Sequence, residues 1–191
     1  LLYFYIEGKL WSSDTNIVSD LLNRVHKYTP PNNLRTLLEA PEEIIHHGFE
    51  ILSKLKNPYK QEIINICPEI VFSEVEPVLI HTDVVSSNLI VSNDGLRLID
   101  WQCPAIGDPV VDIVMFLSPA MHEIYRSERL SINDHESFLS GFAPILRDRY
   151  NKVGPIYHWR LATYCIWKAE NGFVEYENAA LAEIDLLNMM K

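Results

Sequence analysis

Three side chains in the middle of the chain carry oxygen atoms that suit metal and phosphate chemistry. Asp83 and Asn88 interrupt the apolar stretch LIHTDVVSSNLI, residues 79–90, and Asp100 ends the run LRLID, residues 96–100. Such groups are costly to bury unless they are paired, so their place between pieces of core indicates a site. Carboxylate and amide oxygens are hard ligands, which suit Mg²⁺ better than zinc. The carboxylate of Asp83 can also face a substrate hydroxyl.

The elements around these residues explain how they can meet. Short apolar runs predict three strands, at residues 77–80, 89–91 and 96–99. Asn-Asp-Gly at 93–95 separates the last two runs and is a hairpin signal. Because a hairpin returns the chain to its start, we expect Asp100, after the second strand, to lie near Asn88, before the first. Asp83 would then be held a short distance away.

The order of these motifs resembles a known family. HTDVVSSN begins at residue 81 and is followed by IDW at 99–101 and IGDPVVDI at 106–113. The first motif is similar to the catalytic loop of the kinase superfamily. The full set looks like the aminoglycoside phosphotransferase and choline kinase-like family, which carries H-G-D-x-x-x-x-N, I-D-W and G-D-P-x-x-D. The sequence departs from that pattern at Thr82, where the family has glycine, and at Val84-Val85.

The resemblance implies a role for each matching residue. Asp83 would be the catalytic base, which orients or deprotonates the acceptor hydroxyl. Asn88 and Asp100 would bind the Mg²⁺ ions that bridge the phosphates of ATP. His81 would brace the catalytic loop without touching substrate, and Asp108 would support that loop from the start of the next helix.

Several of these residues also have purely structural interpretations. Asp108 precedes Pro109, so it matches a helix N-cap followed by proline at the first helical position, and the two roles are compatible. Asp112, one turn later, is expected to be a surface or first-turn acid. Cys103 is expected to pack in the core. Four aromatic residues on one expected helix favour core packing, with a wall for a cationic amine as the alternative: Tyr157, Trp159, Tyr164 and Trp167.

The remaining periodicity is helical. Apolar residues at helical spacing predict helices that start near residue 12, at 41, 60, 110, 132, 156 and 176. The fold class is therefore mainly α with a small β-hairpin insert (α+β), and the resemblance implies a kinase-like C-terminal lobe. In this reading residues 9–191 form the helical lobe, with the catalytic loop and hairpin at 77–101.

The first residues and the glycines indicate that a lobe is absent. Residues 1–8, LLYFYIEG, look like the hinge-like strand that joins two kinase lobes, with the backbone of Tyr5 and Ile6 pairing with adenine. No two of the seven glycines are two apart, so the sequence has no Gly-rich phosphate loop. We therefore expect the N-terminal, ATP-covering lobe to be missing from this chain, to be its partner in a full-length protein, and to be needed for efficient turnover.

Composition limits the class of partner. The 191 residues include 26 acidic and 16 basic side chains, for a formal net charge of −10. Bulk charge therefore disfavours nucleic acid and anionic membranes and suits a cationic or neutral small molecule, or an anion complexed by Mg²⁺. Three scattered cysteines argue against a disulfide framework and against zinc, so we expect a reducing, cytoplasmic location.

Taken together, these features predict an ATP- and Mg²⁺-dependent phosphotransferase. The γ-phosphoryl group would pass to a hydroxyl of a small molecule, such as an amine-bearing metabolite or an aminoglycoside-like compound. Two alternatives stay open: a non-catalytic, kinase-like binding or regulatory module, and a metal-dependent phosphohydrolase. The sequence leaves the identity of the acceptor open.

Overall fold

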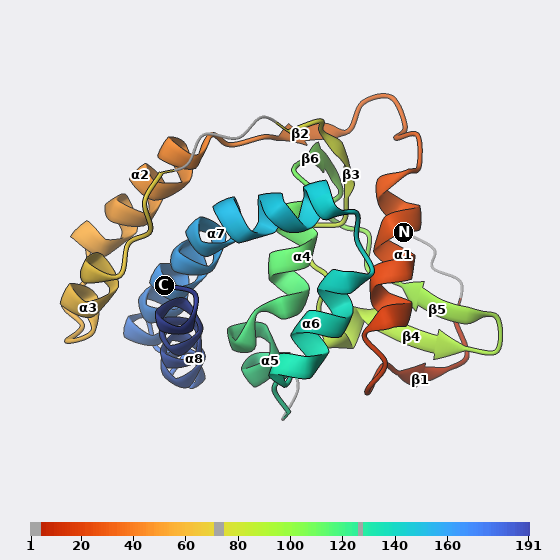
Figure 1. The fold of residues 1–191 in the computed structure, drawn as a ribbon. Coiled ribbons are helices and arrows are strands. Elements are labelled where there is room, and N and C mark those ends of the chain that lie inside the picture. The colour runs from red at the N-terminus through yellow and green to blue at the C-terminus, as the bar shows by residue number, and fades with distance from the viewer. Residues whose placement is uncertain (1–4, 71–74, 126–127) are drawn as a thin grey trace.

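The structure is a computed structural model that describes residues 5–70, 75–125 and 128–191 (Figure 1). Most of this part is helical. The helices are α1 (Asn16–His26), α2 (Pro41–Ser53), α3 (Lys60–Asn65), α4 (Val110–Leu117), α5 (Pro119–Tyr125), α6 (Ile132–Ser140), α7 (Pro144–Glu170) and α8 (Glu175–Met189), with a 3₁₀ turn, η1 (Ser86–Asn88).

Short strands of the described part form two three-stranded sheets. The strands are β1 (Lys9–Leu10), β2 (Arg35–Leu37), β3 (Val78–Ile80), β4 (Leu89–Ser92), β5 (Gly95–Leu98) and β6 (Ala105–Gly107). One sheet has the antiparallel order β1-β4-β5, and the other has the order β2-β6-β3. Helix α1 contacts both sheets, through β3 and β5. The predicted class, mainly α with a small β part, is confirmed.

The β4-β5 hairpin forms as predicted. Ser92 pairs with Gly95 across the turn, and Leu89 pairs with Leu98 at the open end. Gly95 has φ +106°, a left-handed conformation that glycine adopts without strain. The strand expected at residues 1–8 is not found where it can be checked: residues 1–4 lie outside the described part, and the chain from Tyr5 pairs only from Lys9 onward.

The sheet β2-β6-β3 is not predicted by the sequence. Its strands are three residues each, and β2 runs parallel to β6 although they lie far apart in the chain. A Cβ atom at Gly107 would lie 2.4 Å from the backbone oxygen of Leu37, so only glycine permits this close pairing. β3 ends at Ile80, directly before the motif that begins with His81, and β6 ends at Gly107, directly before Asp108 of the second motif. This sheet therefore positions both motifs.

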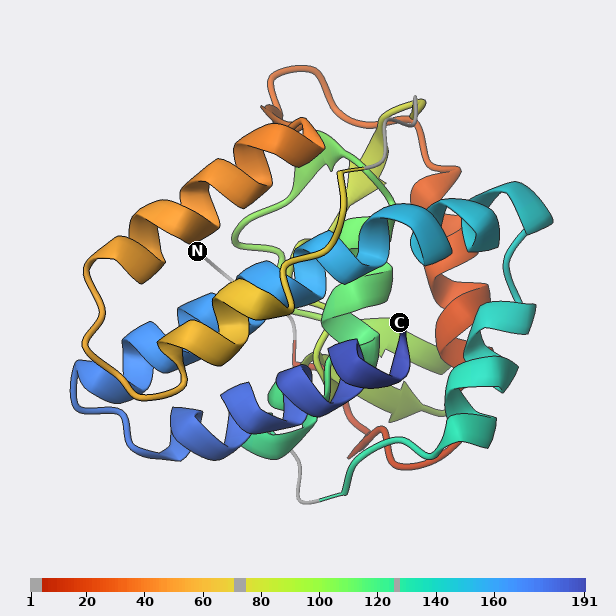
Figure 2. The ribbon, with the colours of Figure 1, turned by 60° about the vertical axis from the view of Figure 1, so that its left-hand side comes forward.

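Helix α7 is the centre of the helical body. Figure 2 shows α2 and α8 on either side of α7, and α4 also packs against it. The sequence predicts that this helix begins at residue 156, but it begins at Pro144 and continues through Pro155. Proline inside a helix costs about 3 kcal/mol. The burial of Tyr150, Val153 and Ile156 on both sides of Pro155 offsets that cost.

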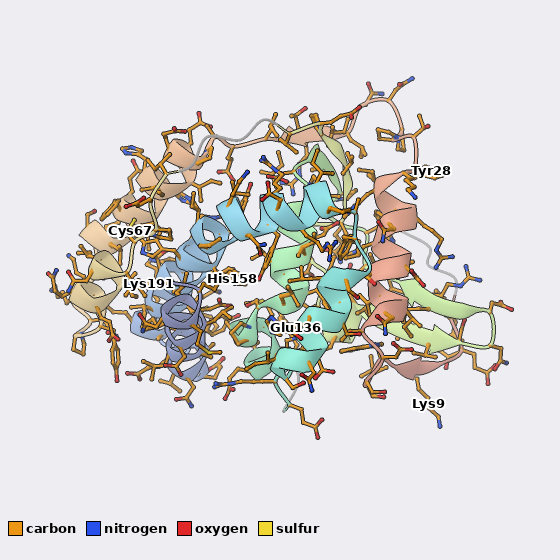
Figure 3. All side chains as sticks on the ribbon, viewed as in Figure 1. Lys9, Tyr28, Cys67, Glu136, His158 and Lys191 are labelled. Atoms are coloured by element: carbon orange, nitrogen blue, oxygen red, sulfur yellow. The ribbon has the colours of Figure 1, made fainter. Side chains whose placement is uncertain are left out.

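A chain of buried polar groups connects three helices within this body. The Ser118 hydroxyl donates to Glu183 Oε1, and His158 Nδ1 lies 2.8 Å from Glu183 Oε2. His158, labelled in Figure 3, reaches Tyr150 Oη with its other ring nitrogen at 3.2 Å. All four residues are buried. Since buried polar groups are tolerated only when they are hydrogen-bonded, these contacts fix α7 and α8 relative to the start of α5.

Candidate active site

His81 anchors the loop of residues 81–88, which connects β3 to β4. Its side chain is buried, and Nε2 lies 3.0 Å from the carbonyl oxygen of Ile99 while Nδ1 accepts from the Asp83 amide at 3.3 Å. These partners assign the proton to Nε2. The ring packs edge-on against Trp101, with centroids 4.7 Å apart. Both ring nitrogens are therefore used by backbone groups.

Asp83 and Asn88 lie in direct contact. Asn88 Nδ2 donates to Asp83 Oδ2 at 2.9 Å and to the Asp83 carbonyl oxygen at 3.0 Å. The side chain of Asn88 is thereby fixed with its amide oxygen directed away from Asp83. Val84 and Val85, which differ from the family pattern, are buried in the core. They anchor the loop from the inside.

The hairpin brings Asp100 to the same place, as its geometry predicts. The Ile99 amide donates to the Asn88 carbonyl at 2.9 Å, so the residue after β5 lies beside the residue before β4. Asn88 and Asp100 line one cavity of about 660 Å³, together with Tyr5, Ile6 and Trp101. Asp100 has φ +63°, an uncommon conformation for a non-glycine residue that is typical of functional sites.

Asp112 binds the catalytic loop. It lies in the first turn of α4, which is one of the two expected placements, but it is not at the surface, which is the other. Its carboxylate is fully buried and accepts from the amides of His81 at 3.0 Å and Thr82 at 2.8 Å. His26 Nε2, from the last turn of α1, lies 3.0 Å from the same carboxylate. Thr82 has φ +73°, which explains why the family carries glycine at this position.

Asp108 lies at the start of α4 but contacts a different partner. Its carboxylate accepts from Arg149 of α7, at 2.6 Å from Nη2, and from the amide of Val110 at 3.0 Å. The second bond is the expected capping interaction. The amides of His81 and Thr82 are bound by Asp112, so the loop support that was expected from Asp108 comes from the residue one turn further on.

A signal for the burial of Asp112 is present in the sequence. It is the one charged residue in the α4 sequence VVDIVMFL, which is apolar on all sides. A helix of that kind is buried, so its single acid must also be buried and hydrogen-bonded. His26, which lies 86 residues away, offers no comparable signal.

The aromatic residues of α7 divide into two groups. Tyr157 and Trp159 are buried, as core packing predicts, whereas Tyr164 and Trp167 are each 37% exposed. Tyr125, at the end of α5, was missed by sequence reasoning. Its carbonyl oxygen accepts from the hydroxyl of Ser86 in η1 at 3.5 Å. Partial burial raises the pKa of Tyr125, and the neighbouring charge of Asp83 and the phenol of Tyr164 raise it further.

Three further observations concern Cys103, metal-binding clusters and membrane-spanning helices in the described part. Cys103 is exposed, so the expected core packing is wrong; its carbonyl oxygen accepts from Thr82 and Arg35. Within the described ranges, no three or more His, Cys, Asp and Glu side chains gather as a metal-binding group. No helix in those ranges is long and apolar enough to cross a bilayer.

The fold is shared with small-molecule kinases of known structure. A choline/ethanolamine kinase family protein from Mesorhizobium loti aligns with a TM-score of 0.64 and 12% identity over 92% of this chain. A choline kinase from Cryptosporidium parvum gives 0.63 and 13% over 97%, and the ADP-bound aminoglycoside phosphotransferase APH(2'')-Ib gives 0.57 and 14% over 97%. The chain spans 60%, 68% and 71% of these three proteins.

Sequence comparison places the chain in a family. No match was found among curated proteins. The model of the phosphotransferase enzyme family, however, matches residues 20–144. That range is well over half of the chain, and it contains the loop, the hairpin, Asp108 and Asp112. The chain therefore belongs to the phosphotransferase enzyme family.

Proposed function

We propose that this chain forms the acceptor and metal-binding lobe of an ATP- and Mg²⁺-dependent kinase of small, amine-bearing molecules. The γ-phosphoryl group passes to a hydroxyl of the acceptor. The observation that carries the proposal is the convergence of Asn88 and Asp100 on one cavity, with Asp83 hydrogen-bonded to Asn88. Family membership supports the same reaction class.

Asp83 is the proposed catalytic base. One carboxylate oxygen, Oδ2, accepts from Asn88, which leaves Oδ1 to accept a hydrogen bond from the acceptor hydroxyl. The Asp83 amide is held by His81 Nδ1, so the residue cannot rotate freely. Phosphoryl transfer depends mainly on positioning and on charge stabilisation, and a fixed carboxylate supplies the positioning.

Asn88 and Asp100 fit a magnesium ion. Because Asn88 Nδ2 is used by Asp83, its Oδ1 remains as a ligand atom. The Asp100 carboxylate is exposed at the cavity and has no hydrogen-bond or ion-pair partner among the described residues. Both are hard oxygen donors of the kind that Mg²⁺ prefers. When bound, the ion offsets the negative charge of the nucleotide phosphates.

We propose that the rest of the cavity wall binds the nucleotide. Ile90, Leu98 and Ile99 line it together with Tyr5 and Ile6. These apolar walls suit a flat base, and the Tyr5–Ile6 backbone would pair with adenine, so the phosphates extend toward Asp100. His81 braces the loop beneath, while Asp108 acts at longer range by tying α7 to the start of α4.

Two features favour a cationic acceptor. The chain has a net charge of −10, and the exposed Tyr125 lies near enough to Asp83 for the charge of that carboxylate to raise its pKa. The carbonyl oxygen of Tyr125 accepts from the hydroxyl of Ser86 in the loop. Burial, the charge of Asp83 and the phenol of Tyr164 raise the pKa of the Tyr125 side chain. Aromatic faces attract organic ammonium groups, so a hydroxylated amine can direct its hydroxyl to Asp83 while its cation meets the rings.

Nucleotide binding tests the metal site. Calorimetric titration of ADP, with and without Mg²⁺, is compared for wild type, Asp100→Ala and the control Asp94→Ala, which removes an exposed acid from the turn of the same hairpin. Loss of a metal-bound carboxylate is expected to weaken Mg²⁺-dependent binding by about tenfold or more. Equal affinities for the two variants would contradict the proposed role of Asp100.

Turnover tests the reaction class. ATP consumption and phosphate release are measured with a panel of hydroxylated amines, in the 191-residue chain and in any longer natural chain that contains it. Asp83→Asn is expected to keep nucleotide binding and to lower transfer by about 10²-fold or more. Phosphate release without acceptor would favour a phosphohydrolase, and nucleotide binding without either reaction would favour a regulatory module.

A further inference from the structure

Three aromatic rings surround the ammonium group of Lys168 at the turn between α7 and α8. Lys168 Nζ lies 4.2 Å from the ring centroid of Phe173, 5.7 Å from that of Tyr176 and 5.8 Å from that of Tyr164. All three distances are within the range of about 6 Å over which a cation is attracted to a ring face. Tyr164, Phe173 and Tyr176 are called the aromatic cage below.

The aromatic cage is built by local structure. Tyr164 and Lys168 are four residues apart on α7 and therefore share a face. Gly172, with φ +99°, reverses the chain after α7, and the Phe173 amide donates to the Lys168 carbonyl at 3.1 Å. Tyr176 follows in the first turn of α8. Its ring contacts the other two, with centroids 6.3 Å from Tyr164 and 6.2 Å from Phe173.

The position of Lys168 is unusual for its charge. The chain has ten more acidic than basic residues, yet the Lys168 ammonium contacts aromatic rings and pairs with no carboxylate of the described residues. By contrast Lys152, also on α7, pairs with Asp148 at 2.6 Å. The cage is open to solvent, since Tyr164 and Phe173 are 37% and 45% exposed. The cage therefore holds the ammonium of Lys168 at the surface.

Helix α5 connects the aromatic cage to the catalytic loop. It packs against α8, which carries Tyr176, and it also contacts η1. At the end of α5, the carbonyl oxygen of Tyr125 accepts from the hydroxyl of Ser86 in η1. The cage and the loop that carries Asp83 therefore lie on either side of one short helix.

We propose that Lys168 is a specificity-determining residue, whose ammonium occupies the aromatic cage and competes with the cationic group of an incoming acceptor. This inference rests on the proposed function, because it assumes an amine-bearing acceptor near Asp83. The lysine stem is flexible and its ammonium is strongly hydrated, so an acceptor with a less hydrated, quaternary ammonium can displace it. A cation that binds the rings more weakly than the Lys168 ammonium does not displace it and is therefore excluded from the aromatic cage.

The experiment uses tetramethylammonium as the probe and the full chain without nucleotide. Binding is followed by the NMR shifts of the aromatic side chains, with tert-butanol as a neutral control of similar shape. Lys168→Met removes the charge and keeps an apolar stem. Lys152→Met removes the same charge elsewhere on α7 and serves as the matched control.

The expected result is a gain in affinity. Lys168→Met binds tetramethylammonium about fivefold more tightly than wild type, as the loss of a competing cation–π contact of ordinary strength implies. Lys152→Met matches wild type, and adding Phe173→Leu to Lys168→Met removes the gain. The inference is overturned if Lys168→Met binds no more tightly than Lys152→Met, or if tert-butanol binds equally well.

The two proposals fail in different measurements. Tetramethylammonium binding needs neither ATP nor the base, so Asp83→Asn is expected to leave the gain unchanged. Loss of phosphotransfer in Asp83→Asn without any effect of Lys168→Met would reject the role of Lys168 alone. A gain in Lys168→Met, together with a longer natural chain that binds nucleotide but transfers no phosphoryl group, would support the cage and reject the kinase reaction.

Discussion

His26 Nε2 and Asp112 Oδ2 lie 3.0 Å apart, although 86 residues separate them in the chain. The contact joins the last turn of α1 to the first turn of α4, and both side chains are almost fully buried. Because Asp112 also accepts from the amides of His81 and Thr82, one carboxylate connects α1 to the loop that carries Asp83. The geometry of that loop therefore depends on residues that lie outside the cavity.

Asp112→Asn is expected to destabilise the fold by about 3 kcal/mol, because an amide group cannot accept all of the donors that the buried carboxylate accepts. Urea unfolding measures the change. Asp20→Asn, which alters an exposed acid on α1, is the matched control and should change stability by less than about 0.5 kcal/mol. A similar small effect for Asp112→Asn would contradict the assigned role.

His26→Leu is expected to cost about 1–2 kcal/mol, because the buried carboxylate of Asp112 loses a donor. His26→Gln can still donate and should be less destabilised. Hydrogen exchange at the Thr82 amide reports the loop directly, and faster exchange is expected in His26→Leu. Equal stability and equal exchange in both variants would show that the contact does not hold the loop.

Thr82→Gly and Thr82→Ala separate strain from hydrogen bonding. Both remove the bond from the Thr82 hydroxyl to the Cys103 carbonyl, but only glycine is relaxed at φ +73°. Thr82→Gly should therefore be more stable than Thr82→Ala by about 1 kcal/mol. Thermal unfolding of the two variants decides it, and a more stable alanine variant would exclude backbone strain at this position.

The stability of the fold should fall in mild acid because of His135. Burial, with a smaller contribution from the nearby His158 and His122, lowers the pKa of His135 to about 4. In the unfolded state His135 has an ordinary pKa near 6.5, so the unfolded state takes up the proton first as the pH falls. The contribution of His135 to stability is therefore fully present above about pH 6.5 and is lost as the pH falls toward 4. The loss from this residue is about 3 kcal/mol.

Removing the imidazole should remove this part of the pH dependence. His135→Asn is compared with His47→Asn, which alters an exposed histidine on α2. Urea unfolding between pH 7 and pH 4 should show a shallower slope for His135→Asn only. If the slopes of wild type and His135→Asn are the same, another group causes the acid sensitivity.

Local chemistry in the sequence determined much of the site. The spacing of Asp83, Asn88 and Asp100 around a hairpin signal is enough to predict that they converge, because hairpin geometry is set by the turn. The start of α2 at Pro41 and of α3 at Lys60 follows from equally local signals. These features depend on neighbours within a few residues.

Tertiary structure alone decided which side chains hold that site in place. The parallel pairing of β2 with β6 and the contact of His26 with Asp112 join distant segments through packing. Helix α7 continues through Pro155 for the same reason. The burial of the apolar residues on both sides of Pro155 outweighs the local preference of proline to end a helix. Contacts of this kind depend on the sum of many weak packing terms over the whole core, which no short sequence pattern records. The sequence by itself determined the chemistry of the loop, and the packed fold decided what supports it.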